Sequence, residues 1–272
     1  MSDNNLLAGW QSRTLDLILK QRVPPGVVDN VTALTHHLYR DAALFDSRFE
    51  SVKSAFLMTR LTCGKIPCVL VVNRITPAIE AFCEEHEIKI DYDTSLAGGI
   101  PCLSLDFIQR LHKRFDTEYV LGVHGDGFPL RKGLDVFVGP YDYIGAPWRA
   151  GAWYTRLVFP YPKYCVGNGG LSLRSKRLCE MVNSFYRRKY KLLPYSYPLI
   201  EDVFYCRVLR RFEKACRETM VYAPPEVAGR FAFEANRDFY ASGGEMPFGF
   251  HSANGFAQVM RDFGNRVEAI TG

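Results

Sequence analysis

The first residues whose types suit ligand binding or acid–base chemistry are His124 and Asp126, in the sequence H-G-D-G. They follow an apolar run at 119–123, which predicts a short strand buried on both faces. Open α/β sheets bind ligands at the carboxyl ends of their strands, and a glycine such as Gly125 lets a ligand approach the backbone. We therefore expect a ligand site here. A polar turn that Asp126 merely caps is the alternative.

A glycine-rich turn with the sequence G-N-G-G occupies residues 167–170. It is not a dinucleotide fingerprint, because the third glycine of G-x-G-x-x-G would fall at Ser172 and the glycines precede the predicted strand. We expect the backbone of Gly169 and Gly170 to lie close to a ligand, with Asn168 as the only side chain there.

Further polar residues stand at element ends in the last third of the chain. Glu201 and Asp202 open a predicted helix, where the helix dipole favours acids, so a structural cap competes with a catalytic role. An alternating segment at 248–250 stops at His251.

Aromatic residues and prolines crowd into residues 140–164. Periodicity is absent after Trp148, which predicts an ordered loop. Aromatic rings offer flat apolar faces on which a sugar can stack. Trp148, Trp153 and Tyr154 are therefore candidates for acceptor binding, and plain packing is the alternative for about half of these rings.

Strand and helix signals alternate in the middle of the chain. Residues 67–72 predict a buried strand that ends at Asn73 and Arg74, and Thr76 caps the helix that follows. This order is typical of a mononucleotide-binding half, so Asn73 and Arg74 are candidates for base or phosphate contacts; an exposed loop arginine is the alternative. A second helix, capped by Ser104, leads to the next strand. The alternation predicts a mainly parallel sheet with helices on both faces.

The first 60 residues carry helical signals. A helix is predicted at 6–18 and a second, amphipathic helix at 27–45. We therefore expect an N-terminal helical extension at residues 1–60 and one α/β domain at residues 61–272.

Composition narrows the class of protein. The 272 residues are 47% hydrophobic and 23% charged, which is ordinary for a globular chain. The net charge of +5 and the pI of about 8.7 suit an anionic ligand or membrane surface and are too weak to indicate nucleic acid. The 8 cysteines show no zinc pattern and read as reduced thiols of a cytosolic chain. Neither a signal peptide nor a spanning run is visible.

A basic run follows the predicted helix after Ser175. It complements the helix dipole and is usually a solvated terminus. Peripheral contact with a membrane headgroup is the other interpretation, through Arg187, Arg188, Lys189 and Lys191.

The order of these motifs resembles glycosyltransferases of the GT-A fold. More closely, it is similar to an uncharacterised glycosyltransferase-like domain family. That family carries a strand ending in one acid, then motifs that match D-Y-I-G-A-P-W at 142–148, G-N-G-G-L-S-L-R at 167–174, E-D-V at 201–203 and G-F-H at 249–251. The resemblance covers roughly residues 104–251, and it implies a GT-A-like (Rossmann-type) α/β fold.

The resemblance also implies roles for the polar residues. In GT-A enzymes a D-x-D motif holds Mn²⁺ or Mg²⁺ on the donor diphosphate. Here His124 replaces the first acid, Asp126 matches the final aspartate, and His251 matches a C-terminal histidine ligand. In inverting members the aspartate of the E-D motif acts as the catalytic base, which implies this role for Asp202. Glu201 would then give local support or a hydrogen bond to the acceptor. The predicted donor-binding set is Asn73, Arg74, His124, Gly125, Asn168, Gly169 and Gly170.

We therefore expect an enzyme that moves a sugar from a nucleotide-sugar donor to a hydroxyl of a glycan or glycoconjugate, inverting and assisted by a divalent metal. The expected location is the cytoplasm, or the periphery of a membrane. A non-catalytic sugar- or nucleotide-binding module is one alternative. A metal-dependent phosphoesterase is another, although dinuclear sites generally need more histidines than the 6 found here.

Overall fold

A computed structural model describes residues 2–19, 21, 23–26, 28–148, 166–190, 199–240 and 244–271. Their helices and strands are, in chain order, α1 (Asp3–Leu19), β1 (Val31–His37), α2 (Ala42–Cys63), β2 (Cys68–Val72), α3 (Pro77–Glu85), β3 (Lys89–Tyr92), α4 (Ile100–Gln109), η1 (Leu111–Lys113), β4 (Tyr119–Gly122), β5 (Tyr143–Gly145), β6 (Ser172–Ser175), α6 (Lys176–Arg188), α7 (Glu201–Val203), η3 (Phe204–Val208), α8 (Leu209–Phe212), α9 (Lys214–Thr219), α10 (Pro225–Phe231), β7 (Ala232–Phe233), β8 (Gly249–Phe250) and α11 (Ala253–Thr271).

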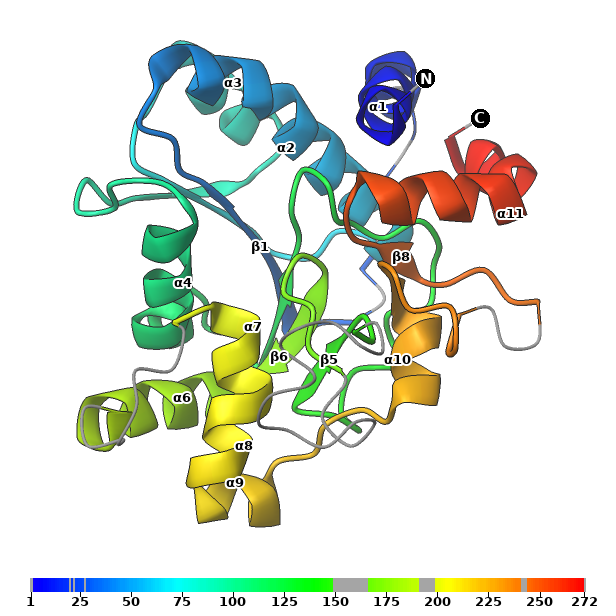
Figure 1. Cartoon of the computed structure of the whole chain (residues 1–272). Coiled ribbons are helices and arrows are strands. Elements are labelled where there is room, and N and C mark those ends of the chain that lie inside the picture. Colours follow the sequence, from blue (N-terminus) through cyan, green and yellow to red (C-terminus); the bar gives the residue numbers. More distant parts are fainter. Residues whose placement is uncertain are drawn as a thin grey trace.

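The centre of the molecule is a mixed sheet with helices on both faces (Figure 1). Its strand order is β3-β2-β1-β4-β6-β5. The first four strands in this order are parallel, and β6 runs antiparallel to both β4 and β5. The predicted α/β fold with a mainly parallel, helix-flanked sheet is thus confirmed.

The central strands are apolar on both faces, and each face meets a different set of helices. Leu121 of β4 belongs to the core shared with α2 and α11, whereas its neighbour Val120 belongs to the core shared with α4 and α6. Likewise Leu70 of β2 lies in the first core and Val71 in the second. A strand buried on both faces reads as a continuous apolar run.

The prediction of a helix at 27–45 is wrong. Residues Val31–His37 form β1, which lies between β2 and β4 in the sheet, and α2 begins only at Ala42. All seven residues of β1 are buried, so the strand shows none of the alternation that separates a half-buried strand from a helix. The boundary expected near residue 60 falls within α2, and residues 1–60 are not purely helical.

The predicted first helix is present as α1, which packs against α2 and α11. Figure 1 shows α1 and α11 side by side, so the first and last helices adjoin at one corner of the molecule. Ser104, the predicted helix cap, lies inside α4, which begins at Ile100. Within the described ranges, no helix combines the length and apolarity needed to cross a membrane.

Candidate metal and donor site

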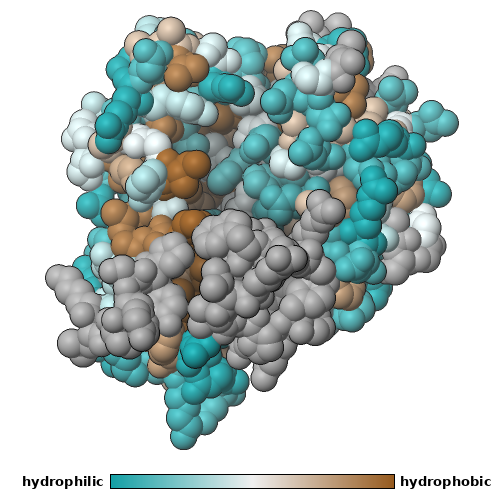
Figure 2. Space-filling view, viewed as in Figure 1, coloured by the Kyte–Doolittle hydropathy of each residue, from teal (hydrophilic) through white to brown (hydrophobic). Residues whose placement is uncertain are grey.

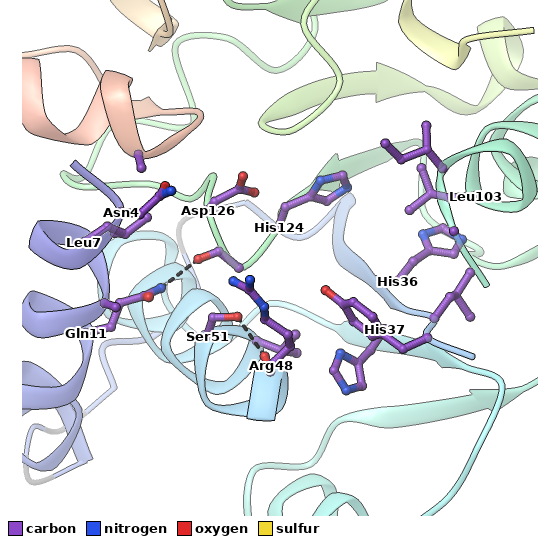
Figure 3. A pocket seen from close by; sticks show the side chains of 18 residues that line it. Asn4, Leu7, Gln11, His36, His37, Arg48, Ser51, Leu103, His124 and Asp126 are labelled. Atoms are coloured by element: carbon purple, nitrogen blue, oxygen red, sulfur yellow. Dashed lines mark hydrogen bonds between the residues drawn. The ribbon is translucent and has the colours of Figure 1, made fainter. Parts of the chain in front are cut away.

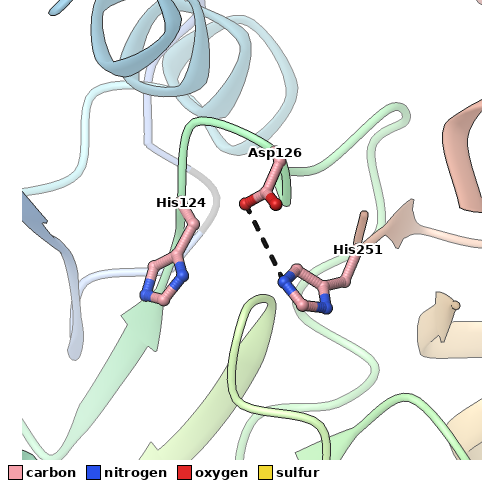
Figure 4. Close-up of side chains that lie close together, drawn as sticks. All are labelled: His124, Asp126 and His251. Carbon is pink, nitrogen blue, oxygen red and sulfur yellow. Dashed lines mark ion pairs between the residues drawn. The ribbon is translucent and has the colours of Figure 1, made fainter. Parts of the chain in front are cut away.

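Three potential metal ligands converge at the carboxyl end of β4. One ring nitrogen each from His124 and His251 and one carboxylate oxygen of Asp126 all lie within 4.8 Å of one another (Figure 4). His124 and Asp126 come from the turn after β4, which closes through hydrogen bonds in both directions between His124 and Gly127 (2.7 and 3.0 Å). His251 arrives from the end of β8. Asp126 and His251, 125 positions apart in the chain, thus lie close together, and their role as metal ligands stays a prediction.

The separation of Asp126 and His251 suits two ligands of one ion. His251 Nε2 lies 3.8 Å from Asp126 Oδ1, which is too long for a hydrogen bond. Ligand atoms that each lie about 2.0–2.2 Å from one ion can be separated by up to roughly 4 Å. The carboxylate of Asp126 is 56% exposed and His251 is 21% exposed, so the site is open to a ligand.

His251 is oriented through its other ring nitrogen. Nδ1 lies 2.7 Å from the amide nitrogen of Asn168 and 3.2 Å from Glu234 Oε1. Burial acts to lower the pKa of His251, but the hydrogen bond with Glu234 and the negative charge of Asp126 outweigh it and raise the pKa. In the tautomer whose Nδ1–H donates to Glu234, this carboxylate fixes the ring and leaves Nε2 for an ion. In the other tautomer Nδ1 accepts from the Asn168 amide and Nε2 carries the proton.

His124 is held as a neutral imidazole. Burial lowers its pKa to about 4, against the opposing effect of the Asp126 carboxylate. Its Nε2 is buried and has no hydrogen-bond partner among the described residues. A neutral ring with an unsatisfied buried nitrogen is the form in which histidine binds metals or accepts hydrogen bonds. The resemblance assigns His124 to the donor, and the structure adds it to the possible ligand set.

The G-N-G-G turn separates this cluster from the acid pair. A Cβ on Gly170 would lie 1.9 Å from His251 Cδ2, and a Cβ on Gly169 would lie 1.6 Å from Glu201 Oε1. Only glycine fits at either position. The side chain of Asn168 is 3% exposed and spans the turn, because its oxygen accepts from the Gly170 amide at 2.8 Å. Gly169 and Gly170 thus pack directly against Glu201 and His251, and the donor contact expected of this turn stays a prediction.

Glu201 and Asp202 meet different surroundings at the start of α7. Glu201 is buried and accepts a hydrogen bond from the buried Arg174 guanidinium at 3.0 Å. Asp202 is half-buried, and its Oδ1 accepts from the backbone amide of Val203 at 2.7 Å. Burial, followed by the negative charge of Glu201, raises the pKa of Asp202 well above its usual value. One acid is thus neutralised by an arginine while the other is a strong proton acceptor once ionised.

A cavity of about 420 Å³ lies beside the metal cluster, at the carboxyl ends of β1 and β4 (Figure 3). Asp126 and His124 stand between its two ends. One end is formed by α1 and α2 with Gln11 and Arg48, and the other by the start of α4 with Leu103. The lining is Asn4, Leu7, Ala8, Gln11, His36, His37, Leu38, Tyr39, Arg48, Ser51, Val52, Gly99, Ile100, Leu103, His124, Gly125, Asp126 and Ala253.

The two ends of the cavity differ in polarity. Arg48 is exposed and is the one arginine or lysine among the described lining residues. At the other end Ile100 is 74% exposed, and Leu38 and Leu103 line the same region. Figure 2 shows hydrophobic residues at the surface where Figure 1 places α4. Sequence reasoning missed this cavity because it took the β1 region for a helix.

A buried ionic network supports the cavity wall at β1. His36 Nε2 lies 2.7 Å from Asp106 Oδ2, and Arg114 donates to the same oxygen at 2.7 Å. Burial acts to raise the pKa of Asp106, but hydrogen bonds from His36 and Arg114 outweigh it and hold the pKa below its usual value. His36 Nδ1 is buried and has no partner among the described residues, although its ring lines the cavity. His36 thus combines a buried ion pair with a place in the cavity wall.

Other predicted contacts fall elsewhere. Asn73 donates to the Tyr39 carbonyl at 3.3 Å, and the Arg74 guanidinium lies 5.6 Å from the ring of Phe45. Neither belongs to the described lining of the cavity. Asn73 therefore supports the segment after β1, which does line it.

The acceptor candidates are only partly described. Trp148 is 3% exposed, a Cβ on Gly167 would meet its ring at 2.4 Å, and the Arg207 guanidinium lies 4.3 Å from it. A ring enclosed in this way offers no free face to a sugar, which corrects the prediction for Trp148. Trp153 and Tyr154 lie outside the described residues.

The basic run is described as far as Lys189. Arg187 and Arg188 are exposed at the end of α6, and Lys189 pairs with Glu213 at 2.9 Å. Lys191 lies outside the described residues. Membrane contact through this run stays a prediction.

Solved structures with a related fold include several sugar transferases. The mannosyltransferase PcManGT from Pyrobaculum calidifontis, solved with GDP-Man and Mn²⁺, shares 14% identity with a TM-score of 0.39; the match covers 82% of this chain and 64% of PcManGT. The galactosyltransferase LgtC, solved with donor and acceptor sugar analogs, shares 14% identity with a TM-score of 0.48, over 89% and 96%. The mannosyltransferase Ktr4p from S. cerevisiae shares 9% identity with a TM-score of 0.41, over 76% and 72%.

Because these TM-scores are below 0.5, a functional assignment has to rest on the site itself. No curated protein matches the sequence. A family model does match, over residues 102–251, which is 150 of the 272 residues and ends at His251. The chain belongs to this family, DUF5672, described as a protein of unknown function.

Proposed function

We propose that this protein is a glycosyltransferase that moves a sugar from a nucleotide-sugar donor to a hydroxyl of a glycan or glycoconjugate. The observation that carries the proposal is the His124–Asp126–His251 cluster. It lies between a cavity lined by one arginine and two neighbouring carboxylates, Glu201 and Asp202, that have different hydrogen-bond partners. The cavity can hold an anionic donor, the cluster can hold a metal ion, and Asp202 can accept a proton.

The residues present fit a divalent metal such as Mn²⁺ or Mg²⁺. The donor set is two imidazole nitrogens and a carboxylate oxygen, which suit such an ion. Three protein ligands leave positions for phosphate oxygens and water. A bound ion would neutralise charge that develops on the leaving diphosphate. His124, Asp126 and His251 would hold it, with Glu234 orienting His251.

The donor occupies the cavity in this proposal. Arg48 gives the diphosphate a cationic partner beside Asp126, and a guanidinium matches phosphate geometry well. The apolar end at Leu38, Ile100 and Leu103 suits the flat face of a nucleobase. Asn73 and Arg74 do not line this cavity, and their donor contacts stay a prediction.

Asp202 takes the proton from the acceptor hydroxyl as that oxygen attacks the anomeric carbon. Its raised pKa makes the ionised carboxylate a stronger base than an ordinary aspartate. Glu201 forms a buried ion pair with Arg174 at the start of α7. A base that acts on the side opposite the leaving diphosphate gives a single displacement with inversion, so an α-linked donor should yield a β-glycoside.

Donor and metal binding can be tested together by thermal unfolding. A panel of nucleoside diphosphates and nucleotide sugars is added with Mn²⁺ or with chelator, to wild type and to Asp126→Asn. We expect at least one nucleotide to raise the wild-type melting temperature with Mn²⁺, because a ligand that binds only the folded state stabilises it. The chelator and Asp126→Asn should each remove most of this effect.

Stabilisation that is equal with chelator and in Asp126→Asn would contradict the metal role. Release of phosphate from a chromogenic monoester, without use of any nucleotide sugar, would favour a phosphoesterase. Nucleotide binding without turnover would favour a binding module.

A further inference from the structure

A part-buried hydrogen bond joins helix α1 to the metal loop, the turn at residues 124–127 that carries His124 and Asp126. Gln11 Nε2 donates to the carbonyl oxygen of Gly125 at 2.7 Å, across 114 residues of sequence (Figure 3). Gln11 is 7% exposed, and it lines the cavity together with Asn4 and Leu7 of the same helix. This helix lies wholly before the segment matched by the family model.

The residue before Gln11 fixes the helix at the same place. Trp10 is 1% exposed, and its ring stacks on Phe128 with centroids 6.1 Å apart and tilts onto Phe256 at 5.2 Å. Phe128 lies two residues after Asp126, and Gly125 lies one residue before it. Adjacent residues of α1 therefore contact the metal loop on both sides of Asp126.

Asp126 needs such support because its own side chain has little. Its carboxylate is 56% exposed, and it approaches His251 Nε2 only to 3.8 Å, which is too long for a hydrogen bond. The direction of the carboxylate therefore depends on the backbone at 125–126. That backbone is held by Ser252, whose amide donates to the Asp126 carbonyl at 2.8 Å, and by Gln11 at the Gly125 carbonyl. Gly125 itself packs against Ser51, where a Cβ would lie 2.4 Å from the Ser51 hydroxyl oxygen.

We propose that Gln11 is a positioning residue for the metal site, and that α1 therefore contributes to metal binding as well as lining the proposed donor cavity. The bond to the Gly125 carbonyl holds the peptide plane so that the Asp126 carboxylate faces His251. This inference rests on the proposed metal-assisted function. It assigns to α1 a role in the site in addition to packing.

The test compares metal binding by two variants of the full chain. Gln11→Met keeps the length and shape of the side chain but cannot donate to Gly125. Gln21→Met is the matched control, because Gln21 donates to the Ile270 carbonyl at 3.3 Å just beyond the other end of α1, away from the metal loop. Mn²⁺ is titrated calorimetrically into each metal-free protein, without nucleotide, and thermal unfolding is recorded with chelator.

We expect Gln11→Met to weaken Mn²⁺ binding about 10-fold or more, as is typical when a residue that orients a ligand is lost. Gln21→Met should bind Mn²⁺ as wild type does, even if its melting temperature falls. Gln11→Asn keeps the amide but shortens its reach, so it should show the same weakening. This milder variant serves if Gln11→Met unfolds far more readily than Gln21→Met.

Two results would overturn the inference in distinguishable ways. Equal Mn²⁺ affinity in wild type and both Gln11 variants means that Gln11 does not position the site, while the metal site itself stands. No Mn²⁺ binding by wild type means that the metal role in the proposed function fails, and the inference fails with it.

Discussion

At the scale of single residues, the contrast between Glu201 and Asp202 defines the proposed chemistry. They are adjacent in sequence, yet Glu201 is paired with Arg174, whereas the Asp202 carboxylate accepts from the backbone amide of Val203. The sequence predicts an acid pair at a helix start, and the structure supplies the difference between its members. That difference depends on Arg174, 27 residues earlier in the chain, which sequence spacing alone does not connect to Glu201.

The raised pKa of Asp202 predicts that this residue costs stability at neutral pH. A carboxyl with a raised folded-state pKa stabilises the fold fully below the unfolded value of about 4, and this contribution is lost as pH rises through the folded pKa. Asp202→Asn removes that loss. Measured by thermal unfolding with chelator, the variant should therefore melt at a higher temperature than wild type at pH 7, with a difference that shrinks towards pH 4.

Each unit by which the folded-state pKa of Asp202 exceeds the unfolded value costs about 1.4 kcal/mol of folding free energy at a pH above both values. In a chain of this size, each kcal/mol changes the melting temperature by about 2–4 °C. Glu201→Gln is the control of opposite sign, because it breaks the buried pair with Arg174 and should cost roughly 3–5 kcal/mol. An Asp202→Asn protein less stable than wild type at pH 7 would argue against a raised pKa.

At the scale of elements, the G-N-G-G turn sets the distance between the metal cluster and the acids. A Cβ on Gly170 would overlap the ring of His251, so Gly170→Ala must displace either the turn or the ligand. We expect lower stability, by about 1–3 kcal/mol, and loss of Mn²⁺-dependent stabilisation. Gly264→Ala in α11 is the control, because its new methyl would meet nothing closer than Met260 Cε at 3.8 Å.

For Gly264→Ala, thermal unfolding should show unchanged or slightly higher stability and intact Mn²⁺ binding, since alanine is the better helix former. A Gly170→Ala protein that still gains stability from Mn²⁺ as wild type does would contradict the close packing of the turn on His251.

Some helices and strands could be predicted from the sequence and others could not. The strand before Asp126, the strand at 67–72 and the helix opened by Glu201 are as predicted, because each pairs a clear apolar run with a chain-breaking or capping signal. β1 was mistaken for a helix, since full burial on both faces removes its alternation. Trp148 was assigned by residue type, but its ring is enclosed by Gly167 and Arg207, contacts that spacing does not reveal.

At the scale of the whole molecule, the proposed active site joins two parts of the chain. The family match at 102–251 contains His124, Asp126 and His251, together with both acids. The helices and strand that complete the cavity, α1, β1 and α2, precede that segment. The resemblance noted in the sequence therefore predicts Asp126 and His251 as ligands and the two acids, but neither His124 as a ligand nor the remainder of the cavity.

The most direct test of the central claim is turnover of a nucleotide sugar. Wild type, Asp126→Asn and Asp202→Asn are each incubated with Mn²⁺, a panel of nucleotide sugars and a panel of glycan acceptors, and released nucleoside diphosphate is measured. We predict release from at least one donor by wild type, with an acceptor-dependent rate. The kcat of Asp202→Asn should be lower by roughly 10²–10⁴ while donor affinity stays close to wild type. A wild-type protein that binds Mn²⁺ and nucleotide but releases no diphosphate with any donor and acceptor, or an Asp202→Asn enzyme with near-normal kcat, would contradict the account.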